Sequence, residues 1–134
     1  MSFKKRQRFI PKSKSDAIRV RHMLAINKAL HFMKDKSRED LSNDELLSLA
    51  LVRLLEVLGE AAAKVSADVT DKYPAIPWHE IIGTRNRLIH GYDDVNLDIL
   101  WQIVSVDLLP LPSIFLNMLQ QLEQTEQHGL FPQK

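Results

Sequence analysis

The chain has 134 residues, of which 45% are hydrophobic and 26% charged, as in an ordinary single globular domain. It contains no cysteine, which excludes disulfides and thiolate metal sites, and no apolar run approaches the ~20 residues that span a bilayer. We therefore expect a cytoplasmic protein without a signal peptide, a membrane segment or a membrane partner.

The net charge of +1 conceals a basic amino end. Six of the 18 lysines and arginines precede Asp16, the first of the 17 acidic residues. The rest of the chain therefore has 12 basic and 17 acidic side chains, a balance of −5, which is not typical of a nucleic-acid-binding domain. We interpret residues 1–14 as a flexible, solvated arm; the alternative is an arm that contacts RNA phosphates without sequence specificity.

Two helical stretches are predicted before residue 66. Ser15 and Asp16 are typical of a helix start, and the apolar spacing that follows predicts an amphipathic helix to about residue 36. A polar connection is expected at 37–43. Within it, Ser42 and Glu45 have the spacing of a capping box, so a long helix is expected to begin there and to run to about residue 65.

The second of these stretches is apolar on nearly all sides, which is typical of a helix at the centre of a bundle or in a dimer interface. Its conspicuous polar residues are Arg53, Glu56 and Glu60. The run of small residues that begins at Gly59 permits close approach of another helix.

Residues 84–92 (TRNRLIHGY) gather a guanidinium, an amide, an imidazole and a phenol. Pro77 suits the first turn of a helix, and we predict one helix from there to about His90, with a glycine as its stop. On such a helix Arg85 falls in the middle of an apolar stripe. Asn86 and His90, four residues apart, share the flank beside that stripe.

An arginine in an apolar stripe requires a partner or a functional reason. The structural explanation is an ion pair with a carboxylate of the long helix, with Glu60 as first choice and Glu56 as the alternative, and with His90 as a cation at a helix C-terminus. The functional explanation is a site in which Arg85 and His90 bind a polyanion. The pattern by itself leaves both open.

The last third of the chain also reads as helical. Asn96 is predicted to cap a helix to about residue 108, Pro110 and Pro112 to break it, and a further helix to occupy about 113–124. We find no strand pattern, glycine-rich phosphate loop or metal-ligand cluster in the sequence. The predicted fold is all-α: an antiparallel four-helix bundle over residues 15–126, with its last helix broken by the prolines and a frayed tail at 127–134.

The spacing Arg85-x4-His90-x-Tyr92, with Asn86 directly after the arginine, resembles the R-x4-H-x-Y signature of HEPN-domain proteins of the HepT-like type. Other segments resemble the same family in the same order: GEAA at 59–62, PWHEIIG at 77–83 and VNLDILW at 95–101. The resemblance extends over about residues 16–125 and implies a HEPN-like helical fold.

This resemblance implies the toxin of a toxin–antitoxin pair, an endoribonuclease neutralised by a minimal nucleotidyltransferase antitoxin. It implies catalytic roles for Arg85 and His90 and an AMP attached to Tyr92, for which a packing tyrosine is the alternative. Asn86 is the candidate for orienting a phosphate. The alternatives for the whole protein are a non-catalytic HEPN dimer that binds a nucleotide or a protein, and a purely structural dimer with Arg85 in an internal ion pair.

Cleavage of RNA by its own 2′-hydroxyl needs a base, an acid and cations, but no metal or other cofactor. His90 can act as base or acid, and Arg85 can bind the phosphate. On one helix these residues would lie roughly 140° apart and ~7.5 Å along the axis, and one copy supplies only one imidazole. We therefore predict an obligate homodimer, as in HEPN relatives, with the motif at the dimer cleft and an interface built from the long helix and the last helix.

Overall fold

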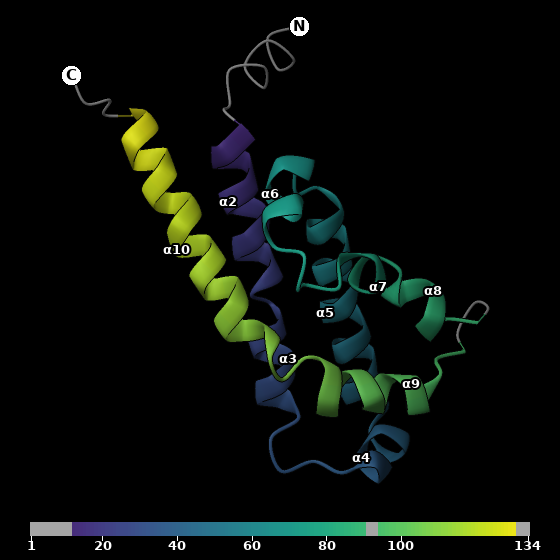
Figure 1. The fold of residues 1–134 in the computed structure, drawn as a ribbon. Coiled ribbons are helices and arrows are strands. Elements are labelled where there is room, and N and C mark those ends of the chain that lie inside the picture. The colour runs from purple at the N-terminus through teal and green to yellow at the C-terminus, as the bar shows by residue number, and fades with distance from the viewer. Residues whose placement is uncertain (1–11, 91–93, 131–134) are drawn as a thin grey trace, which may run out of the picture.

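The computed structural model describes the backbone of residues 12–90 and 94–130, with side chains described from residue 16 to 125 except at 91–93. The predicted all-α class is confirmed, because every regular element in the described part of the chain is a helix. The predicted helices that end near residues 36 and 90 are each divided into two shorter helices (Figure 1). Both described ends, that of α2 (Lys12–Met23) and that of α10 (Leu111–Leu130), lie at the same end of the molecule (Figure 1).

The first predicted helix is two helices, α2 and α3 (Ile26–Phe32), so its predicted continuity to residue 36 is wrong. At the junction the backbone N–H of Leu24 bonds the carbonyl of Arg21, three residues back, which tightens the turn. The start is also earlier than predicted. Asp16 does not cap this helix; its buried carboxylate instead accepts bonds from the N–H and hydroxyl of Ser66, at 2.8 and 2.7 Å.

The expected polar connection at 37–43 contains a helix, α4 (Arg38–Asn43). Its capping box joins Ser37 to Asp40, and the pKa of the Asp40 carboxyl is lowered because it accepts the backbone N–H of Ser37 at 2.6 Å. The predicted Ser42–Glu45 box is wrong. The long helix α5 (Glu45–Ala63) is capped by Asp44, whose Oδ1 accepts the N–H of Leu47 at 3.1 Å.

Helix α5 lies at the centre of the protein, as its apolar sequence predicts. It contacts α2, α3, α4, α7 (Trp78–Ile82) and α8 (Thr84–Leu88). The expected close approach occurs at Gly59, where an added Cβ would lie 3.2 Å from the carbonyl oxygen of Ile81 and 3.6 Å from that of Ile82. The backbone of α7 therefore crosses α5 at the one residue of α5 that has no side chain.

The carboxyl-terminal part follows the predicted breaks. After α6 (Ala67–Lys72), α7 and α8, the helix α9 (Leu97–Gln102) is capped by Asn96. The Asn96 side chain accepts the N–H groups of Asp98 and Ile99 at 3.1 Å, which confirms the predicted cap. A π-helical turn, η1 (Ile103–Asp107), continues α9, and α10 begins beyond Pro110. Helix α10 lies along α2 (Figure 1), and Glu123 of α10 pairs with Arg21 of α2 at 2.5 Å.

Within the described residues no single helix has the length and apolarity needed to cross a membrane. The pair Leu97–Asp107 and Leu111–Thr125 meets these criteria only when taken together, and it is bent by 62°. The bend lies at residues 108–110, so Pro110 stands at the predicted interruption, whereas Pro112 lies in the first turn of α10 and does not break a helix.

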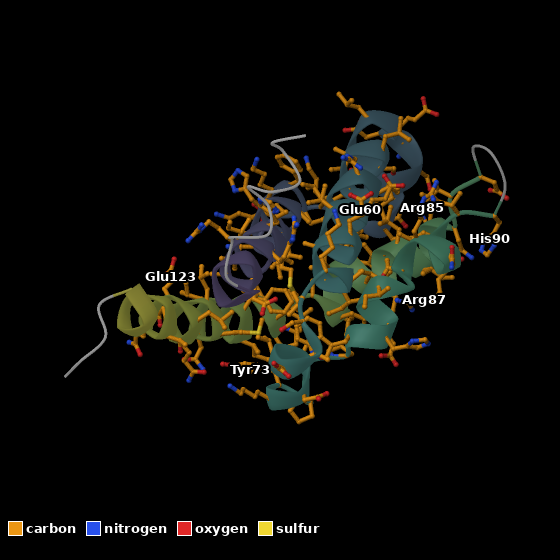
Figure 2. All side chains as sticks on the ribbon, turned by 90° about the horizontal axis from the view of Figure 1, so that it is seen from above. Glu60, Tyr73, Arg85, Arg87, His90 and Glu123 are labelled. Carbon is orange, nitrogen blue, oxygen red and sulfur yellow. The ribbon has the colours of Figure 1, made fainter. Side chains whose placement is uncertain are left out.

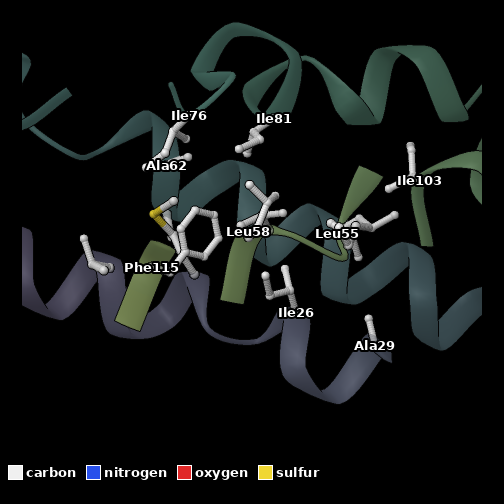
Figure 3. Packing of buried hydrophobic residues seen from close by; sticks show 14 of the residues in the cluster. Ile26, Ala29, Leu55, Leu58, Ala62, Ile76, Ile81, Ile103 and Phe115 are labelled. Carbon is white, nitrogen blue, oxygen red and sulfur yellow. The ribbon is translucent and has the colours of Figure 1, made fainter. Parts of the chain in front are cut away.

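The core is formed where α2, α3, α5, α7 and α10 meet. Phe115 of α10 and Leu58 of α5 are almost completely inaccessible, and Ile26 of α3 and Ile81 of α7 pack in the same cluster (Figure 3). Burial of side chains of this size provides most of the favourable free energy of folding, at roughly 1.5–3 kcal/mol each. The core thus holds α7, the helix directly before the motif, against α5.

Candidate functional site

The motif stretch forms two short helices, so the prediction of one helix from Pro77 to His90 is wrong. Helix α7 ends at Ile82, and α8 begins after Gly83. The buried Thr84 donates its hydroxyl to the carbonyl of Glu80 at 2.8 Å, which satisfies a polar group at the break. Because the helix is interrupted, the predicted apolar stripe is not continuous: Ile82 is 45% exposed, whereas Leu88 of α8 is buried.

His90 lies beyond the end of α8, not in its last turn. Ile89 is already extended, with φ −110° and ψ 116°, and forms an isolated antiparallel bridge with Val95. The N–H of His90 bonds the carbonyl of Asp94 at 2.9 Å. The orientation of His90 is therefore set by extended backbone, so the helical shared flank predicted for Asn86 and His90, and the 140° between Arg85 and His90, do not apply.

Arg85 is paired with Glu56 across α8 and α5. The guanidinium Nε lies 2.9 Å from Glu56 Oε2, and the exposed fractions of the two side chains are 68% and 22%. The carboxylate is thus anchored in the surface of α5, and the guanidinium is the exposed partner. Arg85 does not point into the protein core, in contrast to what the predicted stripe implied.

Glu60, the first-choice partner of Arg85, is not its partner in the structure. Its carboxylate lies 4.0 Å from Arg53, and Arg53 also approaches Glu56 at 3.6 Å. The alternative, Glu56, is therefore correct. The outward face of α5 places Glu56 between two arginines, a role that the sequence pattern did not assign to Arg53.

Arg85 and His90 are both exposed and lie at the same end of the molecule, around α8 (Figure 2). Asn86, next to Arg85 on α8, is exposed as well. An arginine, an amide and an imidazole are thus brought to one surface, where they are accessible to a phosphate. Tyr92 lies outside the described residues.

Arg87 is not part of this surface. It points away from Arg85 (Figure 2), as residues two apart on a helix do, and lines a cavity of about 530 Å³ between α5, α7, α8 and the start of α10. The floor of this cavity is apolar, with Leu55, Leu58 and Ile103 among its residues. This cavity is therefore separate from the Arg85 and His90 surface.

No group of three or more His, Asp or Glu side chains suited to a metal ion is found among the described residues. The chemically versatile groups near Arg85 are instead an imidazole and carboxylates. The Arg85 guanidinium and an imidazole can bind anionic oxygens, and an imidazole or a carboxylate can transfer protons.

An all-helical domain that exposes an Arg-x4-His pair at one end has the features of the HEPN class. Residues 23–119 match the model of the family described as "Ribonuclease HepT-like", and the chain belongs to this family. "Probable ribonuclease HepT" of Thermococcus cleftensis is 34% identical over 91 residues, which cover 68% of this chain and 83% of the relative. "Putative RNase MJ1380" of Methanocaldococcus jannaschii is 37% identical over 81 residues, covering 60% and 74%. No solved structure matches.

Proposed function

We propose that the protein is an endoribonuclease that cleaves RNA without a metal ion. The ribose 2′-hydroxyl attacks the adjacent phosphorus, and the bond from phosphorus to the 5′-oxygen breaks, which leaves a 2′,3′-cyclic phosphate and a 5′-hydroxyl. A base must accept the 2′-proton, an acid must protonate the leaving 5′-oxygen, and cations must stabilise the charge on the pentavalent phosphorus. The ribonuclease names of both relatives support this class of activity.

The observation that carries the proposal is the exposed Arg85, held by Glu56, at the same end of the molecule as the exposed His90. The contact with Glu56 engages Nε, which leaves the two Nη groups of Arg85 for phosphate oxygens. His90 is the group for proton transfer, because imidazole is the side chain that most readily gains and loses a proton near neutral pH. Asn86 is placed to orient the phosphate.

We further propose that the helices form a HEPN-type antiparallel bundle and that two copies build one active site. A single copy supplies one imidazole for two proton transfers, whereas a dimer around a two-fold axis supplies two. The outward face of α5 is the candidate interface. It continues from Arg53 and Glu56 toward Leu46 and Leu49, which are 79% and 54% exposed, and residues spaced by three or four share one face of a helix.

The proposed biological role is that of a toxin whose antitoxin is a minimal nucleotidyltransferase. AMP attached to Tyr92, two residues after His90, would add negative charge beside Arg85 and His90 and would compete with RNA for both. In cells that contain both proteins, we expect a mass increase of the toxin by AMP units. The increase should be absent in Tyr92→Phe, and modification of another residue would reject this part of the proposal.

The ribonuclease proposal is tested with purified protein and RNA in buffer that contains EDTA. We expect fragments with 2′,3′-cyclic phosphate ends, and a rate at least about 100-fold lower for Arg85→Ala and for His90→Ala. Arg21→Ala is the matched control, because it removes an exposed, ion-paired arginine on a different face, and it should remain within about twofold of the wild type.

Two outcomes would contradict the proposal. Cleavage that is unchanged in Arg85→Ala and His90→Ala would exclude this surface as the active site. Binding of RNA or nucleotides without cleavage would favour a non-catalytic HEPN dimer instead. Helicity and thermal unfolding measured by circular dichroism show that each variant is folded before its rate is compared.

A further inference from the structure

A charged cleft lies between α2 and α5, beside the Glu56–Arg85 pair. It has a volume of about 250 Å³ and is lined by Arg19, His22, Val57, Glu60, Ala61 and Lys64. Glu60 and Lys64 follow Glu56 at spacings of four and eight residues, so these two continue the outward face that carries the Arg85 contact, whereas Ala61 is buried. The cleft and the candidate active site are therefore parts of one surface.

The cations of this cleft lack partners in the described part of the protein. Arg19 is half-buried, and its Nε is buried without a hydrogen-bond partner among the described residues. Neither Arg19 nor Lys64 belongs to an ion pair formed by these residues. A buried donor without an acceptor destabilises a protein unless a ligand or water satisfies it. The site thus has donors and positive charge available for an anion.

We propose that this cleft binds a phosphate group of the RNA strand, a few nucleotides away from the phosphate at Arg85; this inference depends on the proposed function. From Glu56 to Lys64 the helix rises about 12 Å, so a phosphate in the cleft is a different one from the phosphate at Arg85. Arg19 provides a planar guanidinium and Lys64 a compact positive charge, the two groups that proteins use most for phosphate oxygens. The chemistry is that of any phosphate, so a mononucleotide must be tested as well.

The cleft also contains a carboxylate, whose negative charge opposes the binding of an anion. Glu60 lines it and lies 4.0 Å from Arg53, so its carboxylate repels a phosphate in the same cavity. The proposal therefore predicts effects of opposite sign for different residues of one cleft. Loss of the cations should weaken RNA binding, and loss of the Glu60 charge should strengthen it.

The test measures binding of a fluorescent RNA of about 12 nucleotides with 2′-O-methyl groups, which blocks cleavage by 2′-hydroxyl attack. For the double variant Arg19→Gln, Lys64→Gln we expect at least a tenfold higher Kd at low salt. The slope of log Kd against log salt concentration should fall by roughly 0.7, because the cleft holds one phosphate and each phosphate contact on a single strand contributes about 0.7. The control, Lys28→Gln with Lys72→Gln, removes the same charge from exposed positions on α3 and α6 and should change Kd less than twofold.

Glu60→Gln should lower Kd by about two- to fivefold, an effect that damage to the fold does not produce. Equal effects of the two double variants, absence of RNA binding by the wild type, or no change in Glu60→Gln would overturn the proposal. AMP bound through Arg19 and Lys64 as tightly as RNA would overturn it in favour of a mononucleotide site. Cleavage of unmodified RNA is measured separately. A protein that binds RNA through this cleft but does not cleave it would contradict the proposed ribonuclease activity and still support the phosphate site in the cleft.

Discussion

The Arg85 guanidinium is both ion-paired and exposed to solvent. Its partner, Glu56, is the more buried of the two groups, and Arg53 lies on the other side of the same carboxylate. Exposed ion pairs contribute only about 0–1 kcal/mol to stability. The main effect of this ion pair is therefore to orient Arg85, because Glu56 limits the positions that the Arg85 side chain occupies before RNA binds.

Replacement of Glu56 by Gln removes the charge and keeps the shape. We expect the rate of RNA cleavage to fall about ten- to a hundredfold, because a misplaced catalytic group costs rates of this order. The same replacement in an Arg85→Ala background should have almost no further effect, since the two residues act as one unit. Glu123→Gln, which breaks the Arg21–Glu123 pair far from α8, is the matched control and should leave the rate unchanged. Additive effects of Glu56 and Arg85 would contradict this view.

At the scale of helices, the crossing of α5 and α7 determines where α8, the helix that carries Arg85, starts in space. Gly59 permits contact between the two backbones, and the break at Gly83 then lets α8 take a different helical phase. In that phase Thr84 and Leu88, four residues apart, face inward and are buried. Arg85 consequently turns outward toward Glu56, and this is why it avoids the apolar stripe.

Valine at position 59 would place side-chain atoms against the backbone of α7. We expect Gly59→Val to reduce the free energy of unfolding by about 1–3 kcal/mol, the usual effect of overpacking. Ala63→Val, at an exposed position of the same helix, should cost less than about 0.7 kcal/mol through helix propensity alone. Urea denaturation of both variants measures this difference. Equal losses would mean that the close approach at Gly59 is unimportant.

The start of α5 offers a second test at this scale. Asp44→Ala removes the side chain that accepts the N–H of Leu47, and we expect a loss of about 1 kcal/mol in the free energy of unfolding. Ser42→Ala, which alters the cap expected from sequence but not the one observed, should cost less than half as much. Denaturant titration distinguishes the two caps, and a larger loss for Ser42→Ala would contradict the observed cap.

At the scale of the whole molecule, α5 is buried on one side and presents Glu56, the partner of Arg85, on the other. Its outward face combines exposed leucines with the Arg53, Glu56 and Glu60 charges. Large exposed apolar side chains beside a polar site are typical of an interaction surface. A second copy placed here would bring two Arg85 side chains toward each other.

We therefore expect Leu46→Glu with Leu49→Glu to convert the proposed dimer into monomers and to abolish the proposed RNA cleavage. Like charges facing each other across a two-fold axis, together with loss of apolar contact, provide the physical reason. Leu116→Glu, at a 48%-exposed leucine of α10, distinguishes the two interface candidates and should leave the dimer intact. Sedimentation velocity measures the state of each protein. Monomers from Leu116→Glu alone would assign the interface to α10.

Signals that act over a few residues were sufficient for several features of this protein. The apolar periodicity predicted the longer helices, Asn96 predicted its cap, and Pro110 predicted the break before α10, whereas Pro112 lies inside α10. The motif residues themselves were also evident from sequence. Each of these features depends on backbone geometry within one or two turns, which adjacent residues control.

Packing between distant segments decided the rest. The choice of Glu56 over Glu60 and the bonds from Ser66 to Asp16 join residues whose proximity no local pattern encodes. The extended backbone at His90 likewise depends on pairing with residues 94–96. The direction of a side chain depends on its position around the helix axis, and a break such as that at Gly83 changes this position for every residue that follows. The directions of Arg85 and His90 therefore depend on how α8 packs across α5.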